Sequence, residues 1–195
     1  MKKISILLIS LTLSTISCKN EKKTNTTDEV NIAEKFVVKP EATTVKWTAY
    51  KTTEKVGVGG EFTTLNFDNK AGESPEEALN NLEFSIPISS LFTNDATNTR
   101  DAKIKASFFG VMLNTDFIKG TIKNANNVYT ASITMNGITN DLPLEVIITD
   151  KRRVKMIAVM NLKDWDALAA LESLNKVCFD LHKGADGISK TWEDV

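Results

Sequence analysis

The stretch Val128-Tyr-Thr-Ala-Ser-Ile-Thr-Met135, followed directly by Asn136-Gly137, decides the fold. Every second residue from Tyr129 to Met135 is apolar or aromatic, and threonine or serine stands between them. This period of two is typical of a strand with one buried face. Asn-Gly predicts a type I′ turn, because both central residues of that turn need positive φ. The stretch therefore predicts a strand that returns on itself in a hairpin.

The same pattern extends in both directions, from Asp116 to Leu162. Further turns are predicted at Asn124–Asn127 and at Asp150–Arg152. The four strands are expected at 116–123, 128–135, 142–148 and 154–160. The residues of the third strand that should face inward are Leu142, Leu144, Val146 and Ile148. Both faces of 154–160 are apolar, so we expect that strand to be covered on both sides.

Three more strands are predicted before this meander, at 43–53, 61–68 and 82–88. The glycine-rich segment Val56–Gly60 is interpreted as a turn, in which glycine permits positive φ or a close backbone approach. A helical turn is expected after Pro75. A short helix is expected at Ala102–Phe109, with Gly110 as its C-cap.

The pattern changes to that of a helix after Leu162. Apolar residues recur at spacings of three and four, and Asp164 or Asp166 can cap the helix start. The stripe consists of Leu168, Leu171, Leu174, Val177, Cys178 and Leu181. Seven strands in all predict an all-β fold, and an antiparallel sheet of this extent usually closes into a barrel. A barrel of about eight strands is wide enough to hold one small ligand.

The N-terminus has the features of an export signal. Residues 1–17 combine two lysines with a short apolar run, which is too short to span a bilayer. Thr15-Ile16-Ser17-Cys18 resembles a bacterial lipobox, which predicts lipidation of Cys18 and a membrane-anchored protein of the cell envelope. The alternative is a plain signal peptide followed by an incidental cysteine. Residues 18–35 are polar and without period, so we expect a flexible tether, and 36–195 should form the domain.

Composition excludes some classes of function. Without residues 1–17 the chain has 22 basic and 25 acidic residues, a net charge of −3, so no basic stripe for nucleic acid is indicated. The chain has two cysteines, so an acylated Cys18 would leave Cys178 without an intrachain disulfide partner. We expect no cofactor and no metal. The sequence leaves open whether the chain forms a dimer.

Three segments resemble the YceI-like lipid- and polyisoprenoid-binding family. They are Trp47 with Lys51 and Gly57 to Phe62, the Arg100-Asp101 segment that ends in Phe108-Phe109, and Asn136-Gly137-Ile138-Thr139. The resemblance implies an extended antiparallel, lipocalin-like barrel that holds a long apolar chain. It also implies a short helix at the mouth and one helix in the C-terminal region.

The sequence departs from the family pattern at three places. The family often has histidine where Lys103 stands and aspartate where Ser107 stands, and it usually continues with one more strand after a segment like Ser189–Val195. Either this sequence is truncated or its barrel closes by another route.

Large apolar residues are the candidate ligand contacts, because ligand pockets are mainly apolar with few polar groups. They either fill the core or line a channel, and the resemblance favours the channel for the group. The candidates are Trp47, Phe62, Phe67, Phe84, Ile86, Phe108, Phe109 and Phe117. Arg100 and Asp101 are expected to pair with each other and pin the short helix at the barrel mouth. The alternative is that Arg100 contacts the head group of a ligand.

Catalytic and metal sites are poorly supported. Cys178 and His182 stand four apart, which could give half a metal site or an activated thiol, but the chain has no second histidine. A core cysteine and a helix-end cation explain the pair better. The sequence therefore predicts a non-enzymatic envelope protein that binds a long-chain isoprenoid or other lipid. The alternative is an envelope β-sandwich lipoprotein that mediates protein–protein interaction.

Overall fold

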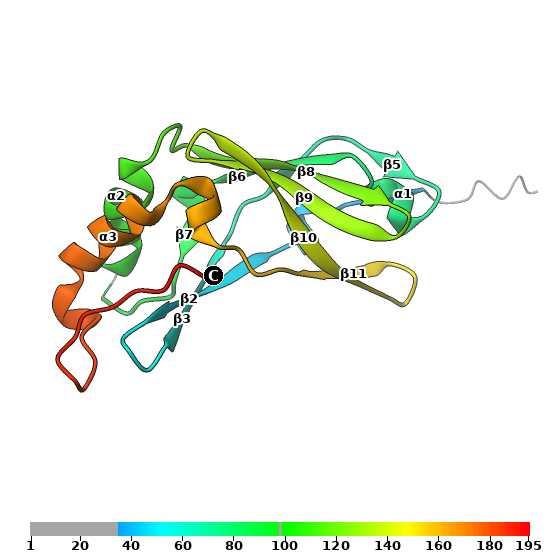
Figure 1. Cartoon of the computed structure of the whole chain (residues 1–195). Helices are drawn as coiled ribbons and strands as arrows, with labels where there is room; N and C mark the ends of the chain where they lie inside the picture. The colour runs from blue at the N-terminus through cyan, green and yellow to red at the C-terminus, as the bar shows by residue number, and fades with distance from the viewer. Residues whose placement is uncertain (1–34, 98) are drawn as a thin grey trace, which may run out of the picture. The chain divides into compact units, whose positions relative to one another are not determined.

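The computed structural model describes residues 35–97 and 99–195. The predicted signal peptide, the lipidation site Cys18 and the predicted tether up to Glu34 lie outside these residues. The described part of the chain is all-β in character, with eleven strands and three α-helices (Figure 1). None of its helices combines the length and the apolar character that crossing a membrane requires.

Six strands form one curled antiparallel sheet, in the order β11-β10-β9-β8-β6-β4 (Figure 1). Their bounds are β4 Asn66–Phe67, β6 Leu82–Pro87, β8 Phe117–Ala125, β9 Val128–Met135, β10 Ile138–Thr149 and β11 Arg153–Ile157. Strands β8 to β11 follow one another in both chain and sheet, so the predicted meander is confirmed. Asn136 and Gly137 have φ of 53° and 73°, as the predicted turn needs.

Alternation places one face of the meander inside. The four alternate residues of β9 from Tyr129 to Met135 are buried, and the predicted inner residues of β10 are half-buried. On β11 the prediction of cover on both faces is wrong. Val154 and Met156 face inward, but Ile157 is 40% exposed, because β11 is the edge strand of the sheet and no described residue covers its outer face.

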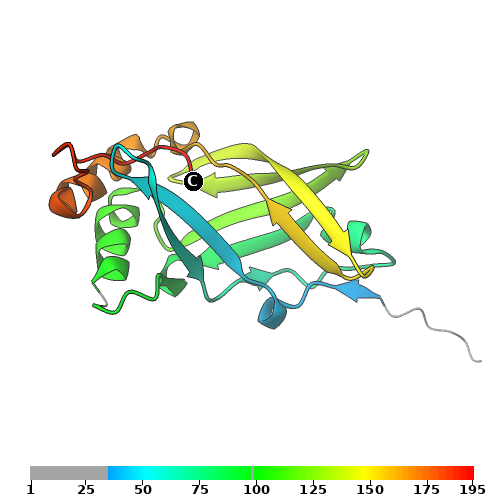
Figure 2. The same cartoon turned by 90° about the horizontal axis from the view of Figure 1, so that it is seen from below.

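A three-stranded sheet of β2 (Val45–Lys51), β3 (Val56–Phe62) and β7 (Leu91–Phe92) lies opposite the meander (Figure 2). The predicted turn at Val56–Gly60 is wrong, because these residues belong to β3. The turn lies at Thr52–Lys55, and its first and last residues both have positive φ. Gly60 permits a close approach, because a Cβ at this position would meet the Trp47 indole at 2.4 Å.

The smaller elements lie at the two ends of the sheets. Strands β1 (Phe36–Val37) and β5 (Ala71–Gly72) pair beside α1 (Pro75–Leu79), at the end away from α2 and α3 (Figure 1). Helix α2 (Arg100–Ser107) packs against α3 (Leu168–Val177) at the other end. The ordering of these helices along the chain agrees with the prediction.

The predicted caps of these helices are wrong. Phe108 ends α2, and Gly110 lies within the 3₁₀ turn Phe109–Val111 that follows. Ala167 precedes α3 without a side-chain cap. Asp164 belongs to a separate 3₁₀ turn, Leu162–Trp165. Asp166 is the C-cap of that turn, and its backbone has the left-handed conformation. The Trp165 Nε1 donates to the Ile133 carbonyl oxygen at 3.0 Å, so this turn is fixed to β9.

Residues 190–195 join the two main sheets. The Trp192 N–H donates to the Tyr50 carbonyl on β2 at 3.1 Å. Met160 and Val195 exchange two backbone hydrogen bonds of 2.9 Å each, just beyond β11. This segment therefore connects the six-stranded sheet to the three-stranded sheet at the end near the helices.

Candidate functional site

A cavity of about 1890 Å³ lies inside the domain and is lined from both main sheets and from α2 and α3. Typical small-molecule pockets measure roughly 300–1,000 Å³, so this cavity is large. Its wall is mainly apolar because the alternate inner residues of the strands face it. The concave faces of two curled sheets leave more space between them than their side chains fill.

Seven of the eight candidate ligand contacts line the cavity. They are Trp47, Phe62, Phe67, Phe84, Ile86, Phe108 and Phe109. Phe117 does not: it is 41% exposed on the outer face of β8, and Lys119 Nζ lies 5.8 Å from its ring centroid. On β8 the inward phase begins one residue later, at Ile118, which does line the cavity. The role of the seven residues as ligand contacts stays a prediction.

An aromatic cluster forms the wall where α2 meets the sheets. The Phe109 ring packs edge-on against Phe108 at 5.0 Å and against Phe62 at 6.4 Å between ring centroids. All three residues are buried. Two of them belong to the Phe-Phe pair at the end of α2, so the position of this helix decides where the cavity wall lies.

Trp47 contributes the one inward-facing indole of β2. Its Nε1 is buried and has no hydrogen-bond partner within residues 35–97 and 99–195. An unpaired buried donor costs about 1–3 kcal/mol. The Trp47 indole therefore leaves an unpaired donor that is covered by neighbouring protein atoms in the described part of the chain.

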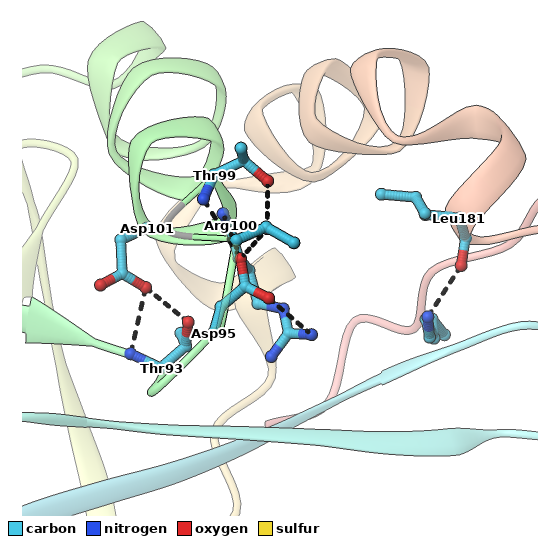
Figure 3. A network of polar contacts seen from close by, with 8 residues as sticks. Thr93, Asp95, Thr99, Arg100, Asp101 and Leu181 are labelled. Carbon is cyan, nitrogen blue, oxygen red and sulfur yellow. Dashed lines mark hydrogen bonds and ion pairs between the residues drawn. The ribbon is translucent and has the colours of Figure 1, made fainter.

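Arg100 and Asp101 do not pair with each other, so that prediction is wrong. Adjacent residues on a helix point in different directions. Asp101 accepts from the backbone N–H and the hydroxyl of Thr93, whereas Arg100 lies 3.8 Å from Asp95 (Figure 3). The two residues still pin α2, because both bind the segment that leads from β7 to the helix.

Asp95 is the centre of this pinning network. Its carboxylate accepts from the backbone N–H of Thr99 at 3.1 Å and of Arg100 at 3.2 Å (Figure 3). The Thr97 hydroxyl is the largest influence that lowers the pKa of Asp95, followed by the Arg100 N–H. Asp95 is therefore ionised at neutral pH and balances the charge of Arg100.

His182 lines the cavity and is neutral, so the prediction of a helix-end cation is wrong. Helix α3 ends at Val177, and a 3₁₀ turn, Phe179–Leu181, separates it from the histidine. Burial, followed by the charges of Lys51 and Lys103, lowers the pKa of His182 from 6.5 to about 4. Its Nδ1 lies 2.9 Å from the Asn175 Oδ1.

Lys51 and Lys103 are half-buried residues that line the cavity and were not among the candidate contacts. Lys51 ends β2 in phase with the inward residue Trp47, so strand alternation alone could have found it. Its Nζ donates to the Leu181 carbonyl at 2.8 Å (Figure 3). Lys103 faces the same cavity from α2. The helical pattern did not distinguish Lys103 from the neighbouring Lys105, although position 103 is one where the family pattern often has histidine.

Cys178 is buried and also lines the cavity. Within residues 35–97 and 99–195, no three side chains of His, Cys, Asp or Glu gather closely enough to hold a metal ion. Cys178 is therefore part of the apolar wall, as the interpretation of a core cysteine requires.

A solved structure shares this fold. A structure described as a polyisoprenoid binding domain from Saccharophagus degradans has a TM-score of 0.59 at 12% identity, over 83% of this chain and 92% of that chain. The Campylobacter jejuni YceI protein has a TM-score of 0.42 at 20% identity, over 72% of this chain and 85% of that chain. Comparison with curated proteins found no match. The sequence model of the YceI-like domain matches residues 36–189, which is most of the chain. The chain therefore belongs to the YceI-like domain family.

Proposed function

We propose that this chain holds one long-chain lipid of the polyisoprenoid class in its cavity and performs no covalent chemistry on it. The observation that carries this proposal is the large, mainly apolar cavity between the two sheets. Burying an apolar chain gains roughly 0.8 kcal/mol per CH₂, so a long tail binds tightly without a catalytic group. The alternative, a β-sandwich interaction module, would have an interior filled by side chains.

Similarity supports the ligand class. The structure from Saccharophagus degradans is described as a polyisoprenoid binding domain, and this chain shares its fold. The extension to this chain rests on the common fold together with the apolar cavity. The position of the seven aromatic and aliphatic candidates on the cavity wall fits the same class of ligand.

The proposed setting is the cell envelope. It rests on the sequence of residues 1–35, in which a short apolar run precedes Cys18 and a polar tether follows it. An acylated Cys18 would keep the cavity close to a membrane, from which a lipid can enter it. Mass spectrometry of the N-terminal peptide tests this: two or three acyl chains on Cys18 support the anchor, and an unmodified Cys18 contradicts it.

Binding is tested by titrating the purified chain with a fluorescent polyprenyl probe and displacing the probe with unlabelled polyprenol. We expect one probe per chain and full displacement. A folded protein that takes up no probe, and from which no lipid can be extracted, would contradict the proposed function. In that outcome the interaction module would be the better account of the fold.

A further inference from the structure

Lys51 and Lys103 are half-buried on the wall of the apolar cavity, and neither forms an ion pair with an acidic residue in the part of the chain that the structure describes. Lys51 uses one of its three N–H donors on the Leu181 carbonyl, and within residues 35–97 and 99–195 the Lys103 ammonium donates no hydrogen bond. Half-buried charges without a partner are unfavourable. Such an arrangement needs a reason.

The two lysines act on the same place. The charges of Lys51 on β2 and of Lys103 on α2 both lower the pKa of His182. Leu181, whose carbonyl Lys51 binds, lines the cavity and is 58% exposed, so the cavity opens to solvent here. Positive charge is therefore concentrated at the opening beside α2 and α3, directly above the apolar interior.

Other cations near the cavity differ from these two. Arg100 is already balanced by Asp95 at 3.8 Å. At the opposite end of the cavity, Lys35 and Arg153 have side chains that are 64% and 81% exposed, and each pairs with an acid. Solvated and paired charges of this kind are the usual state of a protein surface. The remaining cations of the cavity wall, Lys39, Lys46 and Arg152, are exposed as well, so among the described residues that line the cavity Lys51 and Lys103 are the half-buried cations.

We propose that Lys51 and Lys103 form a headgroup site for an amphiphile whose long apolar chain ends in a carboxylate or a phosphate. This inference rests on the proposed function, because the tail would occupy the same apolar cavity. The five remaining ammonium N–H donors would bind the anion, and the tail would run toward β1 and α1. Neutral lipids of equal length would bind through the tail alone.

The test compares headgroups on one chain length in the whole purified chain, stripped of lipid. Geranylgeranyl phosphate is compared with geranylgeraniol, and palmitate with hexadecanol, by displacement of a fluorescent probe. We expect each anion to bind about tenfold or more tightly than its alcohol, as charge-assisted hydrogen bonds allow. The double variant K51M/K103M should bind the anion no better than the alcohol. The two anions distinguish an isoprenoid phosphate from a fatty acid as the source of the headgroup.

The matched control is K35M/R153M, which also removes two positive charges, but from the opposite end of the cavity. It should keep the preference for anions, because those side chains are exposed and paired. A second readout is the NMR titration of His182, the only histidine of the chain. A bound anion should raise the pKa of His182 well above about 4, and it should fail to do so in K51M/K103M.

Two results would overturn the headgroup site. If alcohols and anions bind equally, or if both double variants lose the anion preference to the same extent, lipid carriage stands and the site at Lys51 and Lys103 does not. If neither the alcohols nor the anions bind, the proposed function fails together with the site.

Discussion

The indole of Trp47 lies directly on the backbone of Gly60 in the neighbouring strand. A Cβ built at Gly60 would sit 2.4 Å from Trp47 Cζ2 and 2.7 Å from Cε2. The two residues are register partners in the ladder of β2 and β3. The missing side chain at Gly60 therefore makes room for the largest side chain that β2 turns toward the cavity.

The substitution Gly60→Ala should push the indole out of this position. Overpacking of this kind costs roughly 1–3 kcal/mol, and we expect a loss of that size in urea unfolding. The control is Gly59→Ala, whose Cβ would have one neighbour, the Trp47 carbonyl, at an ordinary 3.5 Å. Equal stability of the two variants would show that the indole is free to move.

The two phenylalanines Phe109 and Phe117 should behave differently when truncated. Phe109 is buried against Phe62 and Phe108, so Phe109→Ala should destabilise the domain by about 3–5 kcal/mol. Phe117 is exposed on the outer face of β8, so Phe117→Ala should cost about 0.5 kcal/mol and leave lipid binding unchanged. Chemical denaturation together with probe binding checks both values. A loss of binding in Phe117→Ala would contradict the assigned orientation of β8.

Strand alternation explains why much of the fold was predictable. The period of two from Tyr129 to Met135 and the Asn136 turn fixed both the pairing and the inner face of the meander, and both are confirmed. The strand conformation of Val56–Gly60 was not predicted, because local sequence cannot distinguish a glycine in a turn from a glycine beneath the indole of a neighbouring strand. The difference depends on Trp47, which lies across the ladder.

Filling the cavity should reduce lipid binding without unfolding the protein. Ala131 is buried on the inner face of β9 and lines the cavity, so Ala131→Phe should weaken lipid binding by tenfold or more, while most of the stability is retained because space is available. Ser132→Phe is the matched control, because Ser132 is the next residue of β9 after Ala131 and faces outward. Probe titration of both variants gives the comparison. Undiminished binding in Ala131→Phe would place the ligand elsewhere.

The neutral state of His182 should make stability depend on pH. The folded pKa of about 4 is below the ordinary 6.5, so between these values the unfolded chain binds a proton that the folded chain does not. The free energy of unfolding should therefore fall as pH decreases from 6.5 to 4. After discounting solvent screening, this contribution is on the order of 1 kcal/mol.

The control for this prediction is His182→Gln, which removes the titrating group. Its stability should fall less steeply than that of the wild type over the same pH range, and carboxylate effects cancel in the comparison. NMR gives an independent value, because the chain has a single histidine. In Lys103→Met the pKa of His182 should rise toward 6.5. A wild-type pKa already at 6.5 would contradict the described surroundings of His182.

The site was less predictable than the fold. Aromatic residues in strand phase could be assigned to the interior, and seven of eight candidates do line the cavity. The polar end could not be assigned, because Lys51, Lys103 and His182 come from three separate elements. They come together because α2 packs against α3 and the turn after α3 contacts Lys51 of β2.

The most direct test of lipid carriage is mass spectrometry of organic extracts from the chain purified from the cells that naturally produce it. The account predicts one long-chain lipid per protein, present in the wild type and depleted in Ala131→Phe. Covalently attached acyl chains stay with the protein and do not confuse the extract. A folded wild-type protein that yields no stoichiometric lipid would contradict the account.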